Sequence, residues 1–249
     1  MAPAQRYDTI GIGYRTFRRP DPRIEAQIWA AVGEAQRIVN VGAGTGSYER
    51  SDRRLLAVEP SAVMVSQRDE RVPVVRATAE SLPFPDNSFD VALALMTVHH
   101  WKDLHRGLAE LRRVAARQII FTFDPAMHDS LWVFNEYVPA ALGLADDTPL
   151  KVLLEALGTD RVEIVPTPAD CTDGFATAYW RRPEHYLSPM ARANISAFAR
   201  LDQRLVEPGI ARLESDLASG AWLERHADLM TMESFDGGLR LVIAGPDPP

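Results

Sequence analysis

The 249-residue sequence has one cysteine and no long apolar run, and both features narrow the class of protein. Because Cys171 is the only cysteine, no disulfide can form within the chain, and a zinc or iron–sulfur site made of several thiolates is excluded. The first residues lack the apolar core of a signal peptide, and no run of about 18 residues is apolar and uncharged. We therefore expect a cytoplasmic protein that does not span a membrane.

Positive charge is also scarce. Lys and Arg number 27 against 34 Asp and Glu, which gives a formal net charge of −7. Proteins that hold a nucleic-acid backbone neutralise its phosphates with clustered Lys and Arg, but the basic stretches 15–20 and 181–185 are short. No H-x-x-x-H or E-x-x-H spacing occurs, so no metal site is expected. We expect a small-molecule partner, neither nucleic acid nor membrane, and a monomer or homodimer.

Short apolar runs alternate with helical patterns along most of the chain. One helical face over 21–36 leads into the first run, and another helix is predicted over 103–114. The runs that predict strands are 37–41, 55–60, 72–77, 89–96, 117–123, 161–166 and 239–245. Because strands alternate with helices, we expect an α/β fold: a Rossmann-like, doubly wound and mostly parallel sheet of seven strands.

The segment before the last strand has a different pattern. Residues 173–232 show apolar positions at helical spacing and no convincing strand. We therefore expect a helical cap inserted before the last strand. The expected parts of a single domain over 1–249 are an N-terminal arm (1–20), a core (21–170), the helical cap (171–232) and the last strand with its tail (233–249).

Three alternating glycines follow the first predicted strand. Gly42, Gly44 and Gly46 allow the backbone to pass close to a ligand that a Cβ atom would displace. The dinucleotide pattern G-x-G-x-x-G would need a third glycine at Ser47, and no phosphate-binding P-loop occurs. Glu59, at the end of the second predicted strand, is suited to accept hydrogen bonds from ribose hydroxyls beside this turn. The pattern predicts a ligand that contains a ribose.

Four motifs appear in order: "VGAGTGSYE", "AVEPS", "AESLPFPDNSFD" and "HHW". In this order and spacing they resemble the class I S-adenosylmethionine-dependent methyltransferases, and most closely the "methyltransferase type 11" or ubiquinone/menaquinone-biosynthesis-like group that acts on small molecules. The resemblance covers 37–125 in detail. It implies S-adenosylmethionine as the cofactor and methyl transfer as the activity.

The resemblance also implies which residues contact the cofactor. The glycines would lie against its methionine part, Glu59 would hold the ribose, and Thr97 would lie where the methionine amine is met. The implied contacts in the core are Asn40, Gly42, Gly44, Gly46, Glu59, Pro60, Ser61, Met64, Ala79, Glu80 and Thr97. Two positions depart from the family pattern, because Asn40 and Thr78 stand where Asp is common. Asn40 can still donate and accept hydrogen bonds.

The N-terminal arm resembles a segment that folds over the cofactor in such proteins. Tyr7 and Tyr14 would close over the methionine tail, and Arg18 or Arg19 would bind its carboxylate through a guanidinium pair. A disordered arm is the alternative.

Histidines lie where a general base would be needed. His99 and His100 directly follow the fourth predicted strand, at the sheet edge where open α/β sheets bind ligands. His128 follows the fifth strand, beyond Asp124. A histidine can take a proton from a hydroxyl or ammonium acceptor near neutral pH. His100 is our preferred base, with His99 and His128 as the other candidates and structural roles as the alternative.

Eight aromatic residues lie in the segments expected to cover the site: Trp101, Trp132, Phe134, Tyr137, Tyr179, Trp180, Tyr186 and Trp222. If half of them face the site, the acceptor is an apolar or aromatic metabolite; otherwise they form the cap's own core. Only two lysines accompany the many arginines, a composition typical of GC-rich genomes, which suggests bacterial secondary metabolism. We expect methyl transfer to an oxygen or nitrogen atom. An NAD-dependent oxidoreductase and a non-catalytic S-adenosylmethionine-binding module are the alternatives.

Overall fold

The computed structural model describes residues 18–69, 71–144 and 149–247. Within these residues, seven strands form one sheet in the order β3-β2-β1-β4-β5-β9-β6. Their bounds are β1 (Ile38–Val41), β2 (Leu55–Val58), β3 (Val74–Val75), β4 (Phe89–Leu95), β5 (Ala115–Phe123), β6 (Val162–Ile164) and β9 (Leu239–Ala244). β9 pairs antiparallel with both β5 and β6, whereas the other pairs are parallel. The predicted fold class and the seven predicted strands are confirmed.

Helices cover both faces of the sheet, so its strands are buried on both sides. Neighbouring residues on β1 separate into two apolar clusters, with Ile38 on the face of the first helix and Val39 on the opposite face. Helix α3 (Pro22–Val32) covers the first face, and α5 (Leu104–Val114) and α6 (Leu150–Leu157) cover the second. Both helices predicted from periodicity, over 21–36 and 103–114, are therefore present. The strands read as continuous apolar runs because neither face meets water.

The strand order reverses direction between β1 and β4. From β1 the chain proceeds to β2 and β3 on one side, and then crosses to β4 and β5 on the other. In open α/β sheets, the loops at such a switch point separate and leave a crevice at the carboxyl ends of the strands. The glycine turn follows β1, and the segment with Thr97 follows β4. The fold therefore brings both predicted motifs to one crevice.

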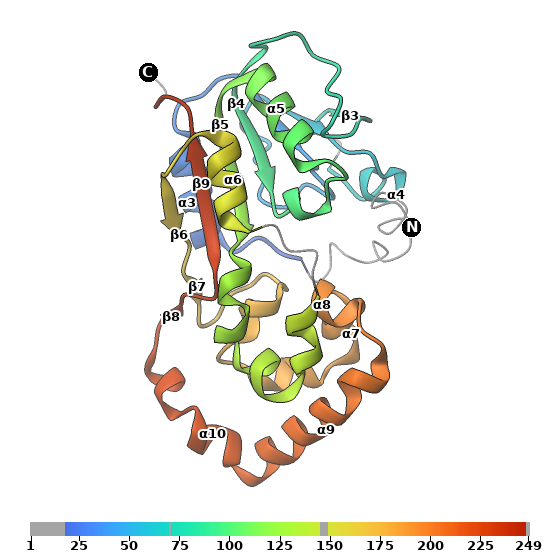
Figure 1. The fold of residues 1–249 in the computed structure, drawn as a ribbon, viewed down its shortest axis with the longest axis vertical. Coiled ribbons are helices and arrows are strands. Elements are labelled where there is room, and N and C mark those ends of the chain that lie inside the picture. Colours follow the sequence, from blue (N-terminus) through green and yellow to red (C-terminus); the bar gives the residue numbers. More distant parts are fainter. Residues whose placement is uncertain (1–17, 70, 145–148, 248–249) are drawn as a thin grey trace.

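The cap lies beyond the carboxyl ends of the parallel strands. A two-stranded ribbon, β7 (Thr167–Pro168) with β8 (Ser234–Phe235), brackets the inserted segment. Figure 1 shows the cap helices below the sheet, with α9 and α10 running along its lower rim. The helical elements of the cap are η5 (Ala176–Tyr179), η6 (Pro183–Leu187), α7 (Pro189–Ala193), α8 (Ser196–Ala199), α9 (Gln203–Ser219), α10 (Ala221–Arg225) and η7 (Ala227–Thr231).

A second segment joins the cap from the core side. After β5 the chain forms η2 (Pro125–Ser130), η3 (Val133–Tyr137) and η4 (Pro139–Gly143). A Cβ atom at Gly209 of α9 would lie 1.9 Å from the carbonyl oxygen of Tyr137, so α9 crosses η3 at backbone distance. The sequence boundaries assigned this segment to the core, but in space it packs with the cap.

Most of the expected aromatic cover is the interior of the cap. Trp132 lies 5.1 Å from Trp222 and 5.4 Å from Tyr186, measured between ring centroids, and its indole N–H donates to the carbonyl of Trp180. Of the eight aromatic residues, only Trp101 and Phe134 line either of the two cavities described below. Fewer than half face the site, so these residues do not themselves indicate an aromatic acceptor.

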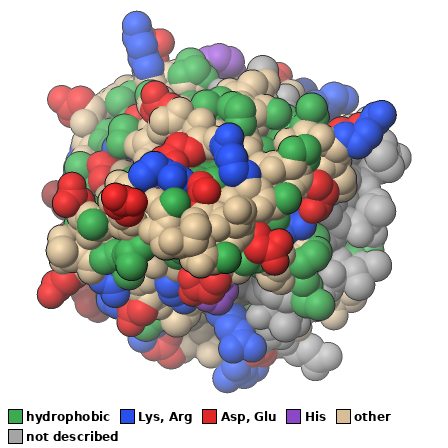
Figure 2. Space-filling view, turned by 90° about the horizontal axis from the view of Figure 1, so that it is seen from below, with side chains coloured by type: hydrophobic (Ala, Val, Ile, Leu, Met, Phe, Trp, Pro, Cys, Tyr) green, Lys and Arg blue, Asp and Glu red, His purple; other side chains and the backbone are tan. Residues whose placement is uncertain are grey.

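The outer face of the cap carries mixed charges. Figure 2 shows acidic, basic and apolar side chains interspersed on the face seen from below. Leu205 of α9 and Leu223 of α10 are exposed apolar side chains of the cap. In the part of the chain that the structure describes, no helix is long and apolar enough to cross a bilayer.

Candidate active site

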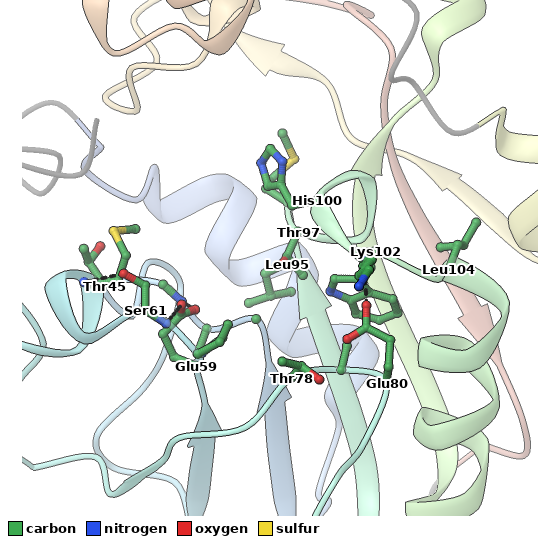
Figure 3. A pocket seen from close by; sticks show the side chains of 18 of the residues that line it. Thr45, Glu59, Ser61, Thr78, Glu80, Leu95, Thr97, His100, Lys102 and Leu104 are labelled. Carbon is green, nitrogen blue, oxygen red and sulfur yellow. Dashed lines mark hydrogen bonds between the residues drawn. The ribbon is translucent and has the colours of Figure 1, made fainter. Parts of the chain in front are cut away.

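A cavity of about 930 Å³ opens at the carboxyl ends of β1, β2 and β4. We call it the donor cavity. Figure 3 shows Glu59 and Ser61 on one side of it, Thr78 and Glu80 on another, and His100 above Thr97 and Leu95. The predicted site residues that line it are Arg18, Gly42, Gly44, Glu59, Pro60, Ser61, Met64, Ala79, Glu80, Thr97 and His100. The fold thus brings together predicted site residues up to 82 positions apart, from Arg18 to His100.

The glycine turn has a backbone that other residues adopt only with strain. Gly42, Gly44 and Gly46 have φ angles of +72°, +54° and +90°. A Cβ atom at Gly42 would lie 2.1 Å from the Thr97 hydroxyl oxygen, so β1 and β4 approach each other closely at this point. Gly46 does not line the donor cavity, and a Cβ there would meet the Glu49 carboxylate instead. Two of the three glycines therefore border the cavity.

Glu59 fixes the turn to the end of β2. One carboxylate oxygen accepts a hydrogen bond from the N–H of Gly44 at 2.7 Å, and the other accepts from the N–H of Ser61 at 2.8 Å. The side chain lines the donor cavity, although Glu59 is only 7% exposed. Backbone donors hold the carboxylate in place, and a carboxylate is the kind of acceptor that a ribose hydroxyl can donate to.

Asn40 has a different role from the one that the family pattern suggested. It does not line the donor cavity, and its amide donates to Glu49 at 2.8 Å. Glu49 also forms a buried ion pair with Arg68, whose guanidinium donates to the carbonyl of Gly44 at 2.9 Å. Burial raises the pKa of the Glu49 carboxyl, and the Arg68 charge opposes that rise. The turn is therefore supported from behind by an Asn–Glu–Arg cluster.

The segment after β3 forms another wall. Ala79 and Glu80 line the cavity, and the Glu80 carboxylate accepts hydrogen bonds from the N–H groups of Lys102 (2.8 Å) and Asp103 (3.2 Å). Burial alone would raise the pKa of Glu80, but these and other hydrogen bonds lower it overall. The side chain of Glu80 thus ties the wall to the start of α5, and the contact of its backbone with adenine stays a prediction.

Arg18 borders the donor cavity, and its guanidinium pairs with Asp173, with Nε 2.6 Å from Oδ1. Tyr7 and Tyr14 lie outside the described residues, so their expected contacts stay predictions. Lys102 and Arg106 also line the cavity, and no motif in the sequence indicated them.

A second, smaller cavity of about 130 Å³ adjoins the donor cavity. We call it the acceptor cavity. Arg18, Met96 and His100 line both. Met96 has a φ of +53°, an uncommon conformation for a residue other than glycine, directly after β4. Much of the lining of the acceptor cavity is apolar, including Phe123, Leu131, Phe134, Phe175 and Ile195. The two cavities meet at the carboxyl end of β4.

The three candidate histidines form a row of rings along the acceptor cavity, which all of them line. The rings of His99 and His100 have centroids 3.9 Å apart, and His99 lies 5.5 Å from Phe123. His128 stacks on the other side of Phe123 at 4.9 Å with an interplanar angle of 17°. Of the three, only His100 also lines the donor cavity. Within the described residues, no three His, Cys, Asp or Glu side chains are grouped as a metal site.

Three residues in or next to the site were not indicated by any sequence pattern. Tyr48 has a φ of +64° and lines the donor cavity, although nothing after the glycines marked it. Arg68 lies four residues after Met64, beyond the end of α4 (Ala62–Val65), and no sequence pattern indicated it. Asp173 is contacted by residues more than a hundred positions away, and no local pattern could have revealed that.

Comparison with known proteins agrees with this architecture. The methyltransferase domain family matches residues 39–122. A solved structure from Anabaena variabilis, described as a candidate methyltransferase from an antibiotic biosynthesis pathway, is 31% identical, covers 92% of this chain and 99% of its own, and has a TM-score of 0.84. Another structure described as a candidate methyltransferase, from Bacillus halodurans, is 14% identical over 89% of this chain and 97% of its own, with a TM-score of 0.53, and shows the fold alone.

A curated relative, the uncharacterized methyltransferase YcgJ of Bacillus subtilis, is 44% identical over 45 residues. That match spans 18% of either chain, so this chain aligns with less than a fifth of that relative.

The fold, the glycine turn and the acid at the end of β2 fit a class I methyltransferase, and the comparisons agree. The chain belongs to the S-adenosylmethionine-dependent methyltransferases of the methyltransferase domain family. Its cofactor is S-adenosylmethionine, and the donor cavity suits that molecule: Gly42 and Gly44 border the cavity without side chains, and Glu59 presents a fixed carboxylate.

Replacing Glu59 by Ala is expected to weaken binding of S-adenosylhomocysteine, the demethylated product, by about 1 to 3 kcal/mol, because charged hydrogen bonds to the ribose are lost. Calorimetric titration measures this. Glu59→Gln, which keeps one acceptor oxygen, should lose less. Unchanged affinity in Glu59→Ala would show that the carboxylate only braces the turn.

Glu49→Gln is expected to destabilise the fold by about 3 kcal/mol, because Arg68 would keep a buried charge without its counter-charge. Denaturant unfolding measures the loss. Asp52→Asn is the matched control, since it breaks an exposed Asp–Arg pair and should leave stability unchanged. Equal effects of the two changes would refute the support assigned to the Asn–Glu–Arg cluster.

Proposed function

We propose that the protein transfers a methyl group from S-adenosylmethionine to an oxygen or nitrogen atom of a small apolar or aromatic molecule. The observation that carries this proposal is the meeting of the donor and acceptor cavities at Met96 and His100. A methyl donor held at the glycine turn and an acceptor held under the cap would face each other across this boundary.

The acceptor cavity favours a small and mostly apolar molecule. Side chains of Phe123, Phe134 and Phe175 supply flat apolar surface, while Asn194 and Ser196 supply polar groups on the cap side. The cap covers the cavity, which limits water beside the reacting atoms. The geometry therefore supports alignment of a bound acceptor as the main source of the rate.

A histidine base would act at the cavity boundary. The bound cofactor supplies an electrophilic methyl group on a sulfonium, which leaves as a thioether. A hydroxyl acceptor loses its proton as the new bond forms, whereas an ammonium must lose one before its nitrogen can attack. A histidine nitrogen can take that proton near neutral pH. His100 is the best candidate because it alone among the three histidines lines both cavities. His99 packs against its ring, and His128 contacts the acceptor side.

The two alternatives have less support. An NAD-dependent oxidoreductase would share the sheet and the ribose-binding acid, but family membership points to S-adenosylmethionine instead. A non-catalytic binding module would have no need for an acceptor site, whereas here a covered apolar cavity adjoins the donor cavity. The relative from an antibiotic biosynthesis pathway favours a role in secondary metabolism. A cytoplasmic location and a monomeric or homodimeric state stay predictions.

The test is transfer of an isotope-labelled methyl group from S-adenosylmethionine to a panel of small phenols, enols, carboxylic acids and aromatic amines. In this assay, His100→Ala should lower turnover roughly a hundredfold and flatten its dependence on pH, because general-base assistance is lost. Affinity for S-adenosylhomocysteine should stay close to wild type.

His105→Ala serves as the control, since His105 is an exposed histidine of α5 that lines neither cavity. It should behave as wild type. If His100→Ala is fully active, alignment alone drives the reaction and the base assignment is wrong. If no acceptor in the panel is methylated while the cofactor binds, the non-catalytic alternative gains support.

A further inference from the structure

The loop that enters the cap is bound along the segment leading into α3. Asp170 pairs with Arg23 at 2.7 Å, and the Thr172 N–H donates to Asp21 at 3.1 Å. Asp173 pairs with Arg18 at 2.6 Å. Residues 170–173 and 18–23 thus run side by side, joined by contacts that become more buried toward Arg18. The first residue of this paired segment, Arg18, borders both cavities.

Asp173 is the most enclosed carboxylate of this loop, with 1% exposure. One of its oxygens accepts from Arg18 Nε at 2.6 Å and from the N–H of Gly174 at 2.7 Å. The other accepts from the Tyr48 hydroxyl at 2.7 Å and from Arg18 Nη2 at 3.3 Å. A buried carboxylate with this many donors has little freedom to move, because each donor would lose its partner.

These partners come from parts of the chain that form different walls of the site. Tyr48 follows the glycine turn and lines the donor cavity. Arg18 borders both cavities, and its guanidinium lies 5.9 Å from the ring of Phe175 in the acceptor cavity. Asp173 thus links the glycine turn, the segment before α3 and the entry of the cap.

Arg18 and Tyr48 both stay protonated and therefore remain hydrogen-bond donors to Asp173. Arginine stays protonated, and its planar guanidinium can bind carboxylates along more than one edge. Burial, together with the nearby Asp173 charge, raises the pKa of Tyr48 well above its ordinary value, so its hydroxyl stays protonated. Asp173 binds Nε and Nη2 of Arg18, which sets the plane of the guanidinium at the boundary of the cavities.

We propose that Asp173 is a positioning residue: it orients Arg18 so that the guanidinium binds the carboxylate in the methionine part of the cofactor. This role rests on the proposed function, in which the donor cavity holds S-adenosylmethionine. Asp173 itself acts only through Arg18 and touches no substrate. The Asp173 carboxylate orients the Arg18 guanidinium, which in turn binds the carboxylate of the cofactor. Hydrogen-bond partners orient the side chains that bind metal ions in the same way.

Two ligands separate this role from a general structural one. S-adenosylhomocysteine carries the amino-acid carboxylate, whereas 5′-methylthioadenosine keeps the adenosine and the sulfur but lacks the amino-acid part. Asp173→Asn should weaken binding of S-adenosylhomocysteine about tenfold and leave binding of 5′-methylthioadenosine within about twofold of wild type, because only the carboxylate contact is lost. Calorimetric titration of the full-length protein with each ligand gives both constants.

Asp170→Asn is the matched control in the same loop, since its carboxylate is exposed and pairs only with Arg23 among the contacts described. Binding of both ligands by this variant should equal wild type. Arg18→Gln should show the same selective loss as Asp173→Asn, and the double variant should lose no more than either single one. Tyr48→Phe, which removes one donor to Asp173, should show a smaller selective loss and carries the test if Asp173→Asn does not fold.

Parallel losses for both ligands would overturn the positioning role, because a structural defect weakens the whole site. Unchanged binding of both ligands by Asp173→Asn, or by Tyr48→Phe and Arg18→Gln, would overturn it as well. Failure of the wild-type protein to bind either ligand would refute the proposed function and this role together. A selective loss in the variants supports both.

Discussion

The site depends on one constraint, the close approach of the glycine turn to the ends of β2 and β4. A Cβ atom at Gly42 would collide with Thr97, and the N–H of Gly44 is bound by the Glu59 carboxylate. Arg68, paired with Glu49, binds the turn's carbonyls from behind. The parallel sheet can place these groups together because its strand order reverses between β1 and β4. The shape of the donor cavity follows from this packing.

The cap adds a second cavity to the crevice at the carboxyl ends of the strands, because cap residues line the acceptor cavity but not the donor cavity. Its entry loop is bound to the segment before α3, and its aromatic residues belong to the same apolar cluster as the α3 face of the sheet. The cap is therefore packed on the core, in addition to its contribution to the acceptor cavity. Under the proposed function, acceptor specificity would lie with a few side chains under the cap, such as Phe175 and Ile195, while the donor site is set by the sheet.

The sequence predicted the fold well because each strand is an apolar run buried on both faces. It also indicated Glu59 and Gly42, since their roles follow from position relative to strand ends. Asn40 was harder: a departure from the family's usual Asp gave no hint that Glu49, nine residues later, supplies the acid of a supporting cluster. Asp173 could not be found locally, because its partners Arg18 and Tyr48 are joined to it only by tertiary packing. The aromatic residues illustrate the same limit, since periodicity does not distinguish a cap's core from a cavity wall.

If the glycine turn holds S-adenosylmethionine, it should also hold the demethylated product. Calorimetric titration of the purified protein with S-adenosylhomocysteine, with NAD titrated in parallel, is the most direct test. We expect tight binding of S-adenosylhomocysteine and none of NAD. Binding of NAD alone, or of neither compound, would contradict S-adenosylmethionine binding at this turn.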